Sequence, residues 1–158
     1  AEALLAKLTK QERERLAKLA ADQEDADQAS SLAAAKGYQG ISGRAGTAIA
    51  YALKQIGDRY VFGAAGLTYW DCSGLTMRAY EAAGVSLPHS SAAQSRMGKK
   101  VNFNNLQPGD LLFYGRPVSH VGIYLGNHKI VHAPRTGSRV KIADYRMGHK
   151  PLVAARRF

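Results

Sequence analysis

The sequence predicts an α+β fold, in which helices pack on a central antiparallel sheet of about five strands and a long N-terminal helix comes first. Two observations support this prediction. Helix-forming patterns fill the first half of the chain, whereas apolar residues alternate with a period of two from about residue 110 onward. Helices followed by a run of closely spaced strands are typical of α+β domains with an antiparallel sheet.

Residues 1–36 are expected to form one helix, either the tail of a coiled coil or a tether. They are rich in Ala, Leu, Glu, Lys and Gln, and no Gly or Pro occurs before Gly37. Charged residues interrupt a strict heptad, so a stable two-stranded coiled coil is not supported by these residues alone. The partial apolar stripe consists of Leu4, Leu5, Leu8, Leu16 and Leu19.

Four glycines in residues 37–46 predict a linker at 37–44, which separates the leading helix from one folded domain at 45–158. Within that domain, apolar spacing predicts a helix over 46–57. A further helix is expected over 72–83, because Asp71 is a good N-cap and Gly84 a good residue just beyond the last turn. The strands are expected at 110–114, 119–125, 129–133, 138–143 and 151–157.

Composition and charge exclude several classes. The sequence has no apolar run of about 18 residues, so no membrane span is expected, and its first twenty residues lack the pattern of a signal peptide. Its single cysteine excludes an internal disulfide and a cysteine-rich zinc site.

The charge is unevenly distributed. Residues 1–36 carry six Lys or Arg and seven Asp or Glu, whereas residues 37–158 carry sixteen and five. The basic domain favours an anionic partner. Nucleic acid is not expected, because no nucleic-acid-binding motif accompanies the charge.

Cys72 is the first candidate functional residue. Counted alone, a free cysteine is usually a small buried residue. However, if Asp71 caps the helix, Cys72 lies in its first turn, where unpaired N–H groups and the positive end of the helix dipole favour a thiolate. This position is expected to lower the thiol pKa from about 8.5 toward neutrality. The sequence therefore predicts a cysteine nucleophile.

A cysteine nucleophile needs a proton carrier for its leaving group, usually a histidine. His120 and His132 lie in neighbouring predicted strands around a Gly-Asn turn signal. They share a face of the hairpin if paired residues have an even sum of numbers, and we predict an odd-length loop that produces this register. His120 is then the base, and His132 orients it. We expect His89, His128 and His149 to be structural or surface residues.

The histidine pair could instead bind a metal ion. Asp110 and Asp144 are available as additional ligands, but the sequence has no HExxH-type spacing. The sequence therefore predicts neither a metal ion nor another cofactor.

Six segments together make the sequence similar to the NlpC-type cell-wall cysteine endopeptidases, a papain-like bacterial family. The resemblance covers roughly residues 44–157, and its specificity comes from the order of the segments and the Cys-His-His spacing. The segments are Gly57–Gly63, Asp71–Leu75, Leu87–Gln94, Leu106–Phe113, Ser119–Tyr124 and Ile130–Ala133.

The resemblance implies a secreted, wall-located enzyme that hydrolyses peptidoglycan stem peptides. The usual bond lies between D-γ-glutamate and the next diamino acid, often meso-diaminopimelate. Cys72 corresponds to the nucleophile, His120 to the base and His132 to the third polar residue. The resemblance also implies substrate-binding roles for Tyr60, Asp71, Ser73 and Ser91. Stem peptides and anionic wall polymers are the expected partners, and the protein is expected to be a monomer.

Two positions depart from the family pattern. Phe62 stands where a tryptophan is common, and His89 stands where the family often has arginine, so the substrate contact of that arginine is not carried over. The leading helix and linker resemble members whose catalytic domain follows a coiled coil. Two alternatives remain: an N-acetylmuramoyl-L-alanine amidase, deamidase or acyltransferase that uses the same site, and a non-catalytic wall-binding module.

Overall fold

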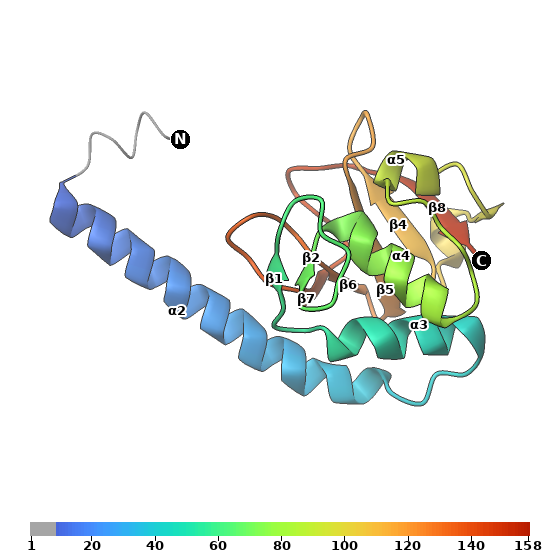
Figure 1. Cartoon of the computed structure of the whole chain (residues 1–158), viewed down its shortest axis with the longest axis horizontal. Helices are drawn as coiled ribbons and strands as arrows, with labels where there is room; N and C mark the ends of the chain where they lie inside the picture. The colour runs from blue at the N-terminus through green and yellow to red at the C-terminus, as the bar shows by residue number, and fades with distance from the viewer. Residues whose placement is uncertain (1–8) are drawn as a thin grey trace.

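The computed structural model describes residues 9–158 and confirms the predicted α+β fold (Figure 1). Leu4, Leu5 and Leu8 of the predicted stripe lie outside the described residues. The long helix α2 (Lys10–Ala35) comes first, and α3 (Gly43–Lys54) and α4 (Cys72–Ala82) then pack beside the sheet. Within residues 9–158, no helix is long and apolar enough to cross a membrane.

The main sheet has six strands, one more than predicted, in the order β3-β8-β4-β5-β6-β7. Every neighbouring pair is antiparallel. The additional strand, β3, has only two residues, which is too short to produce a visible alternation in the sequence. The strands are β3 (Lys99–Lys100), β4 (Leu111–Tyr114), β5 (His120–Gly126), β6 (Lys129–His132), β7 (Lys141–Asp144) and β8 (Leu152–Arg157).

The central strands are buried on both faces. Val121, Ile123 and Leu125 of β5 point to one side and join the core that includes residues of α3 and α4. Tyr124 points to the other side and packs with Ile130 in a second, smaller core. This arrangement anchors β5 firmly, so that the histidine at its first residue occupies a fixed position.

Helix α3 begins at Gly43 and ends at Lys54, three residues earlier at each end than predicted. The predicted linker is therefore partly helical, and a short 3-10 helix at Lys36–Tyr38 fills its start. Gly46 explains why this segment needs glycine within a helix: a Cβ at this position would lie 1.6 Å from the carbonyl oxygen of Ile41.

Helix α4 begins at Cys72, as predicted, and its position depends on two neighbours. The carboxylate of Asp71 accepts a hydrogen bond from the N–H of Gly74 at 2.7 Å and thus caps the helix. Gly74 lies so close to the preceding loop that a Cβ would come within 2.2 Å of the carbonyl oxygen of Ala64. That loop connects β1 (Arg59–Tyr60) to β2 (Tyr69–Trp70), which form a separate parallel pair.

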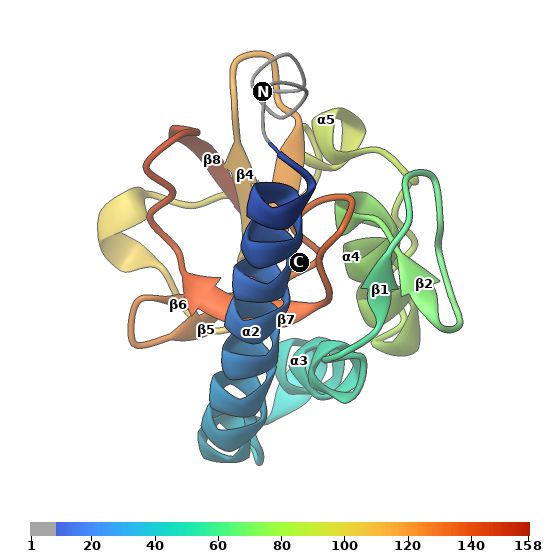
Figure 2. The ribbon, with the colours of Figure 1, turned by 90° about the vertical axis from the view of Figure 1, so that its left-hand side faces the viewer.

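Helix α2 lies along the outer edge of the sheet, next to β7, and runs in front of it in Figure 2. The N-terminal half of α2 extends away from the body (Figure 1). Its contacts with the sheet are mainly polar. Lys141 of β7 donates to Glu24 at 2.7 Å and to Asp27 at 3.0 Å. Ser31 accepts from the N–H of Ile142 at 3.0 Å. These bonds hold the middle of α2 against β7, whose Lys141 lies opposite His132 of β6.

Candidate active site

Cys72 lies at the first turn of α4, and its side chain is buried. Helix α4 packs against β5, and the backbone N–H groups of Val121 and Ser73 favour the thiolate form of Cys72. Burial nevertheless raises the pKa of the Cys72 thiol, because it destabilises the thiolate more than these N–H groups stabilise it. The predicted lowering of this pKa is therefore wrong. Cys72 lies at the start of the helix as expected, but the sequence did not reveal that its sulfur is buried.

His120 and His132 lie next to each other, as predicted. Nε2 of His120 lies 2.8 Å from Nδ1 of His132, and both side chains are buried. The numbers of paired residues in β5 and β6 have an even sum, as for Tyr124 opposite Ile130. This register places the two histidines diagonally on one face of the sheet. This hydrogen bond occupies Nε2 of His120 and leaves its Nδ1 for another partner.

The loop between these strands differs from the prediction. It contains two residues, Asn127 and His128, both with positive φ, and is not odd in length. A β-bulge between Tyr124 and Gly126 adds the residue that restores the even register. The shared face of the histidines thus results from a bulge, which the alternating pattern does not reveal.

The buried environment keeps both imidazoles neutral. Burial, aided by the charges of Lys150 and His149, lowers the pKa of His120 to about 4. The pKa of His132 is well below its usual value, mainly because of burial and also because of His120 and Lys141. At neutral pH the site therefore holds a neutral thiol and a neutral imidazole, which is the state in which His120 can accept a proton.

This buried pair is expected to destabilise the protein in acid. The unfolded chain binds a proton at His120 near pH 6.5, whereas the folded chain binds it only near pH 4. The free energy of unfolding is therefore highest above pH 6.5 and falls as the pH decreases toward 4. His120 alone accounts for a loss of about 3 kcal/mol. His132 adds to this loss in the same direction.

Urea unfolding at pH 7 and at pH 4.5 measures this effect. The double variant His120→Asn/His132→Asn should lose less stability on acidification than the wild type. His128→Asn is a suitable control, because asparagine tolerates the positive φ of this turn position. Equal losses in the wild type and the double variant would contradict the assignment.

The predicted substrate-binding residues lie around Cys72, and they differ in how many hydrogen bonds they already make within the protein. Burial raises the pKa of the Tyr60 hydroxyl, and the nearby Cys72 and Asp71 raise it further when they are ionised. Asp71 is already bound within the protein: it accepts from the N–H of Gly63 at 3.0 Å and contacts His89 at 2.7 Å.

Ser73 and Ser91 occupy positions around the same helix end. The Ser73 hydroxyl is buried and donates to Asp71 at 3.4 Å. Ser91 is the first residue of the short helix α5 (Ser91–Gln94), and Gln94 ties that helix to the carbonyl oxygen of Ser73 at 3.0 Å. The roles assigned to both serines remain predictions.

A cavity of about 530 Å³ opens beside the histidine pair. Its walls come from β6, β7, the segment before β8, and Asp27 of α2. Lys150 and His149 belong to this wall, and sequence reasoning did not assign them a role because they lie in a loop without periodicity. Within residues 9–158, no three His, Cys, Asp or Glu side chains gather where they could hold a metal ion.

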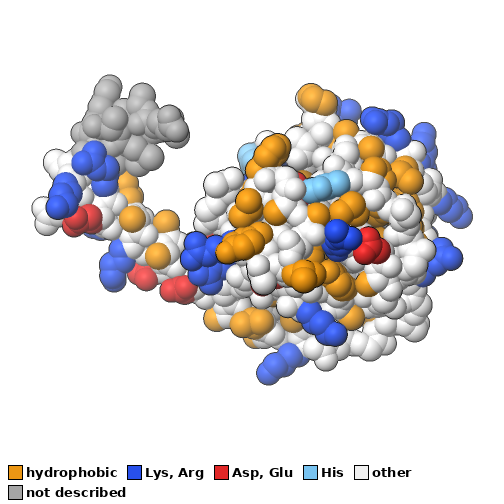
Figure 3. All heavy atoms as spheres, viewed as in Figure 1, with side chains coloured by type: hydrophobic (Ala, Val, Ile, Leu, Met, Phe, Trp, Pro, Cys, Tyr) orange, Lys and Arg blue, Asp and Glu red, His pale blue; other side chains and the backbone are white. Residues whose placement is uncertain are grey.

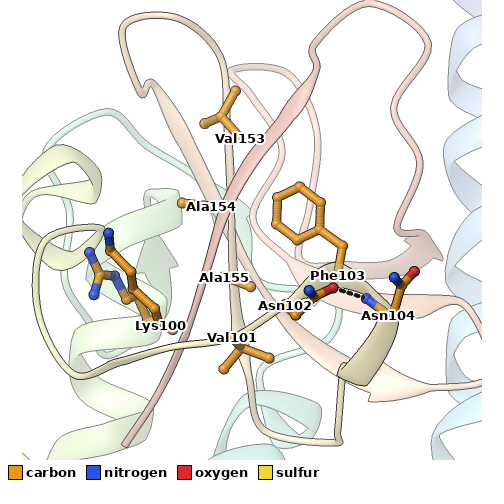
Figure 4. Close-up of a pocket in the computed structure, with 9 residues that line it drawn as sticks. Lys100, Val101, Asn102, Phe103, Asn104, Val153, Ala154 and Ala155 are labelled. Carbon is orange, nitrogen blue, oxygen red and sulfur yellow. Dashed lines mark hydrogen bonds between the residues drawn. The ribbon is translucent and has the colours of Figure 1, made fainter.

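Another hollow of about 550 Å³ lies beside β8 (Figure 4). Its lining includes Val101, Phe103 and Val153 and contains no cysteine or histidine. The sheet order places β3 and β8 at the opposite end from β6 and β7, so this hollow is separate from the candidate site.

A cysteine at a helix N-terminus and two hydrogen-bonded histidines on an antiparallel sheet are an arrangement typical of the papain-like fold. The NlpC/P60 family model matches residues 57–157. The chain therefore belongs to the NlpC/P60 family.

Individual relatives agree with this assignment. The "Probable endopeptidase Rv2190c" of Mycobacterium tuberculosis is 39% identical over 119 residues, which cover 75% of this chain and 31% of that protein. An NlpC/P60 family protein from Bacillus cereus has a TM-score of 0.67 at 30% identity, covering 72% of this chain and 39% of that structure. The NlpC/P60 domain of the peptidoglycan hydrolase SagA has a TM-score of 0.65 at 32% identity, covering 72% and 98%. The chain thus spans about a third of the first of these relatives.

Proposed function

We propose that this chain is a cysteine endopeptidase that hydrolyses peptidoglycan stem peptides, most often at the bond between D-γ-glutamate and meso-diaminopimelate. The observation that carries the proposal is the 2.8 Å contact between His120 and His132 beside the capped helix end that holds Cys72. Membership of the NlpC/P60 family supports the substrate class. Rv2190c is named a probable endopeptidase, and SagA is named a peptidoglycan hydrolase.

The proposed reaction is a two-step acyl transfer. The Cys72 thiol gives its proton to Nδ1 of His120 as the sulfur attacks the scissile carbonyl, and His132 holds Nε2 of the same ring. The oxyanion is held by the backbone N–H of Cys72 and by the Tyr60 hydroxyl. The C–N bond then breaks, His120 returns the proton to the departing amine, and a thioester remains on Cys72. His120 next takes a proton from water, whose oxygen attacks the thioester carbonyl. The C–S bond then breaks, the acyl product leaves as a carboxylic acid, and His120 returns its proton to the sulfur of Cys72.

The proposal extends to the setting of the enzyme. A net charge of +10, concentrated in the catalytic domain, suits a wall rich in anionic polymers, so we propose secretion and a location at the cell wall. Blue Lys and Arg side chains are scattered over the body of the domain in Figure 3, where red acidic side chains are sparse. We further propose a helical segment at 1–36, a linker at 37–44 and a catalytic domain at 45–158 that acts as a monomer.

Mass spectrometry of digested sacculi tests the proposed bond. Wild-type protein should release fragments that end in γ-glutamate together with fragments that begin with the diamino acid. The digest with Cys72→Ala should match the untreated sacculi. Release of intact stem peptides would instead identify an N-acetylmuramoyl-L-alanine amidase and would overturn the endopeptidase proposal.

A further inference from the structure

The cavity beside the histidine pair carries an unbalanced positive charge. Lys141 is paired with two carboxylates, those of Glu24 and Asp27, which together exceed its charge by one. Arg146 is likewise paired with Asp144 at 3.1 Å. Two other cations also line the cavity, Arg135 and Lys150. In the part of the chain that the structure describes, neither of them has an ion-pair partner.

We propose that Arg135 and Lys150 form a carboxylate-binding subsite for the residue on the leaving-group side of the scissile bond. The subsite would select a diamino acid whose side chain ends in a free carboxylate over one that ends in an amine alone. This inference rests on the proposed function and adds to it the two side chains that would recognise the carboxylate of the residue that follows D-γ-glutamate.

The position of the cavity identifies the side of the substrate that it would hold. The cavity is lined by His120 and His132 but not by Cys72. In the proposed reaction His120 protonates the departing amine, so the residue that carries this amine must lie on the histidine side. The acyl part of the substrate stays on Cys72, toward Asp71 and Tyr60.

The two sides of the cleft have opposite charge. Asp71, with an accessible fraction of only 7%, lies on the acyl side. Lys150 lies within electrostatic range of both His120 and Cys72, and Arg135 lies within range of His132 and Asp27. A substrate is therefore best matched when its negative group follows the scissile bond and lies beyond the histidines.

Stem-peptide chemistry contains such a group. The side chain of meso-diaminopimelate ends in an amine and a carboxylate, whereas that of lysine ends in an ammonium group only. Arginine binds a carboxylate through paired N–H groups, and lysine acts as a compact cation. Both would attract the free carboxylate and repel a lone ammonium group, and amidation of the carboxylate would remove the attraction.

The test compares three synthetic peptides that differ only in the residue after D-γ-glutamate: meso-diaminopimelate, its side-chain carboxamide, and L-lysine. Wild-type kcat/KM should be highest for the free acid. The double variant Arg135→Ala/Lys150→Ala should lower the preference for the acid over lysine by about tenfold, mainly through KM. Because the preference is a ratio measured on one protein sample, partial misfolding of the variant does not alter it.

Lys99→Ala is the matched control, since Lys99 is an exposed cation of β3 at the opposite end of the sheet. It should keep the wild-type preference. Equal wild-type cleavage of all three peptides, or an unchanged preference in the double variant, would overturn the carboxylate subsite while leaving the endopeptidase proposal intact. Wild-type cleavage of none of them would overturn the proposed function itself and the subsite with it.

Discussion

Replacement of Cys72 by alanine is expected to abolish stem-peptide hydrolysis, with a fall in kcat of at least about 10⁴-fold. Alanine removes the sulfur but keeps the backbone N–H groups at the start of α4. The substrate should therefore still bind, and KM should change little. Initial rates on a defined γ-glutamyl-diaminopimelate peptide measure this effect.

A matched variant separates chemistry from folding. Thr76 is buried one turn after Cys72 in the same helix, and its hydroxyl contacts Gln94 at 2.7 Å. Thr76→Ser keeps this hydroxyl and should retain activity, whereas thermal melts of Cys72→Ala should show a folded protein. Appreciable turnover by folded Cys72→Ala would refute the role of the cysteine as nucleophile.

His120→Gln is expected to give the second-largest loss, about 10³-fold in kcat, because proton transfer both to and from the ring is removed. His132→Ala should lose about 10²-fold, since His132 acts only by holding the ring of His120. His132→Asn should recover part of that loss, because its side chain can still bond to Nε2.

The same series tests the positioning role of His132. His128→Gln in the neighbouring turn should retain nearly full activity, since its side chain is not part of the histidine pair. The variants should be compared by kcat at saturating substrate. A loss in His132→Ala that appears only in KM, or no recovery in His132→Asn, would mean that His132 does not orient the base.

The sequence was sufficient to predict the elements that position the candidate site. Asp71 before a helical pattern predicted the start of α4, because an N-cap is a local property of the chain. Alternation in residues 119–125 predicted the strand that carries His120. Strand pairing is also largely local in a hairpin, so the proximity of His120 and His132 was predicted. The structure produces it through a bulge and not through the predicted odd-length loop.

Features that depend on how deeply a side chain is buried, or on irregular backbone geometry, could not be predicted from the sequence. The thiol pKa depends on how deeply Cys72 is covered by β5, a long-range contact that the helix-end argument does not include. The bulge before Gly126 changes the register without changing the alternating pattern. Lys150 reaches the site from the irregular segment that connects β7 to β8, two strands that are separated by three others in the sheet.

Affinity labelling tests the central claim most directly. A stem-peptide analogue in which a chloromethyl ketone replaces the scissile amide should alkylate Cys72, forming an S–CH2 bond and releasing chloride. Peptide mapping by mass spectrometry would locate the label. The account predicts a single label on Cys72, loss of hydrolysis in proportion to labelling, and protection by unmodified stem peptide. Protein fully labelled at Cys72 that still hydrolysed stem peptides would contradict it.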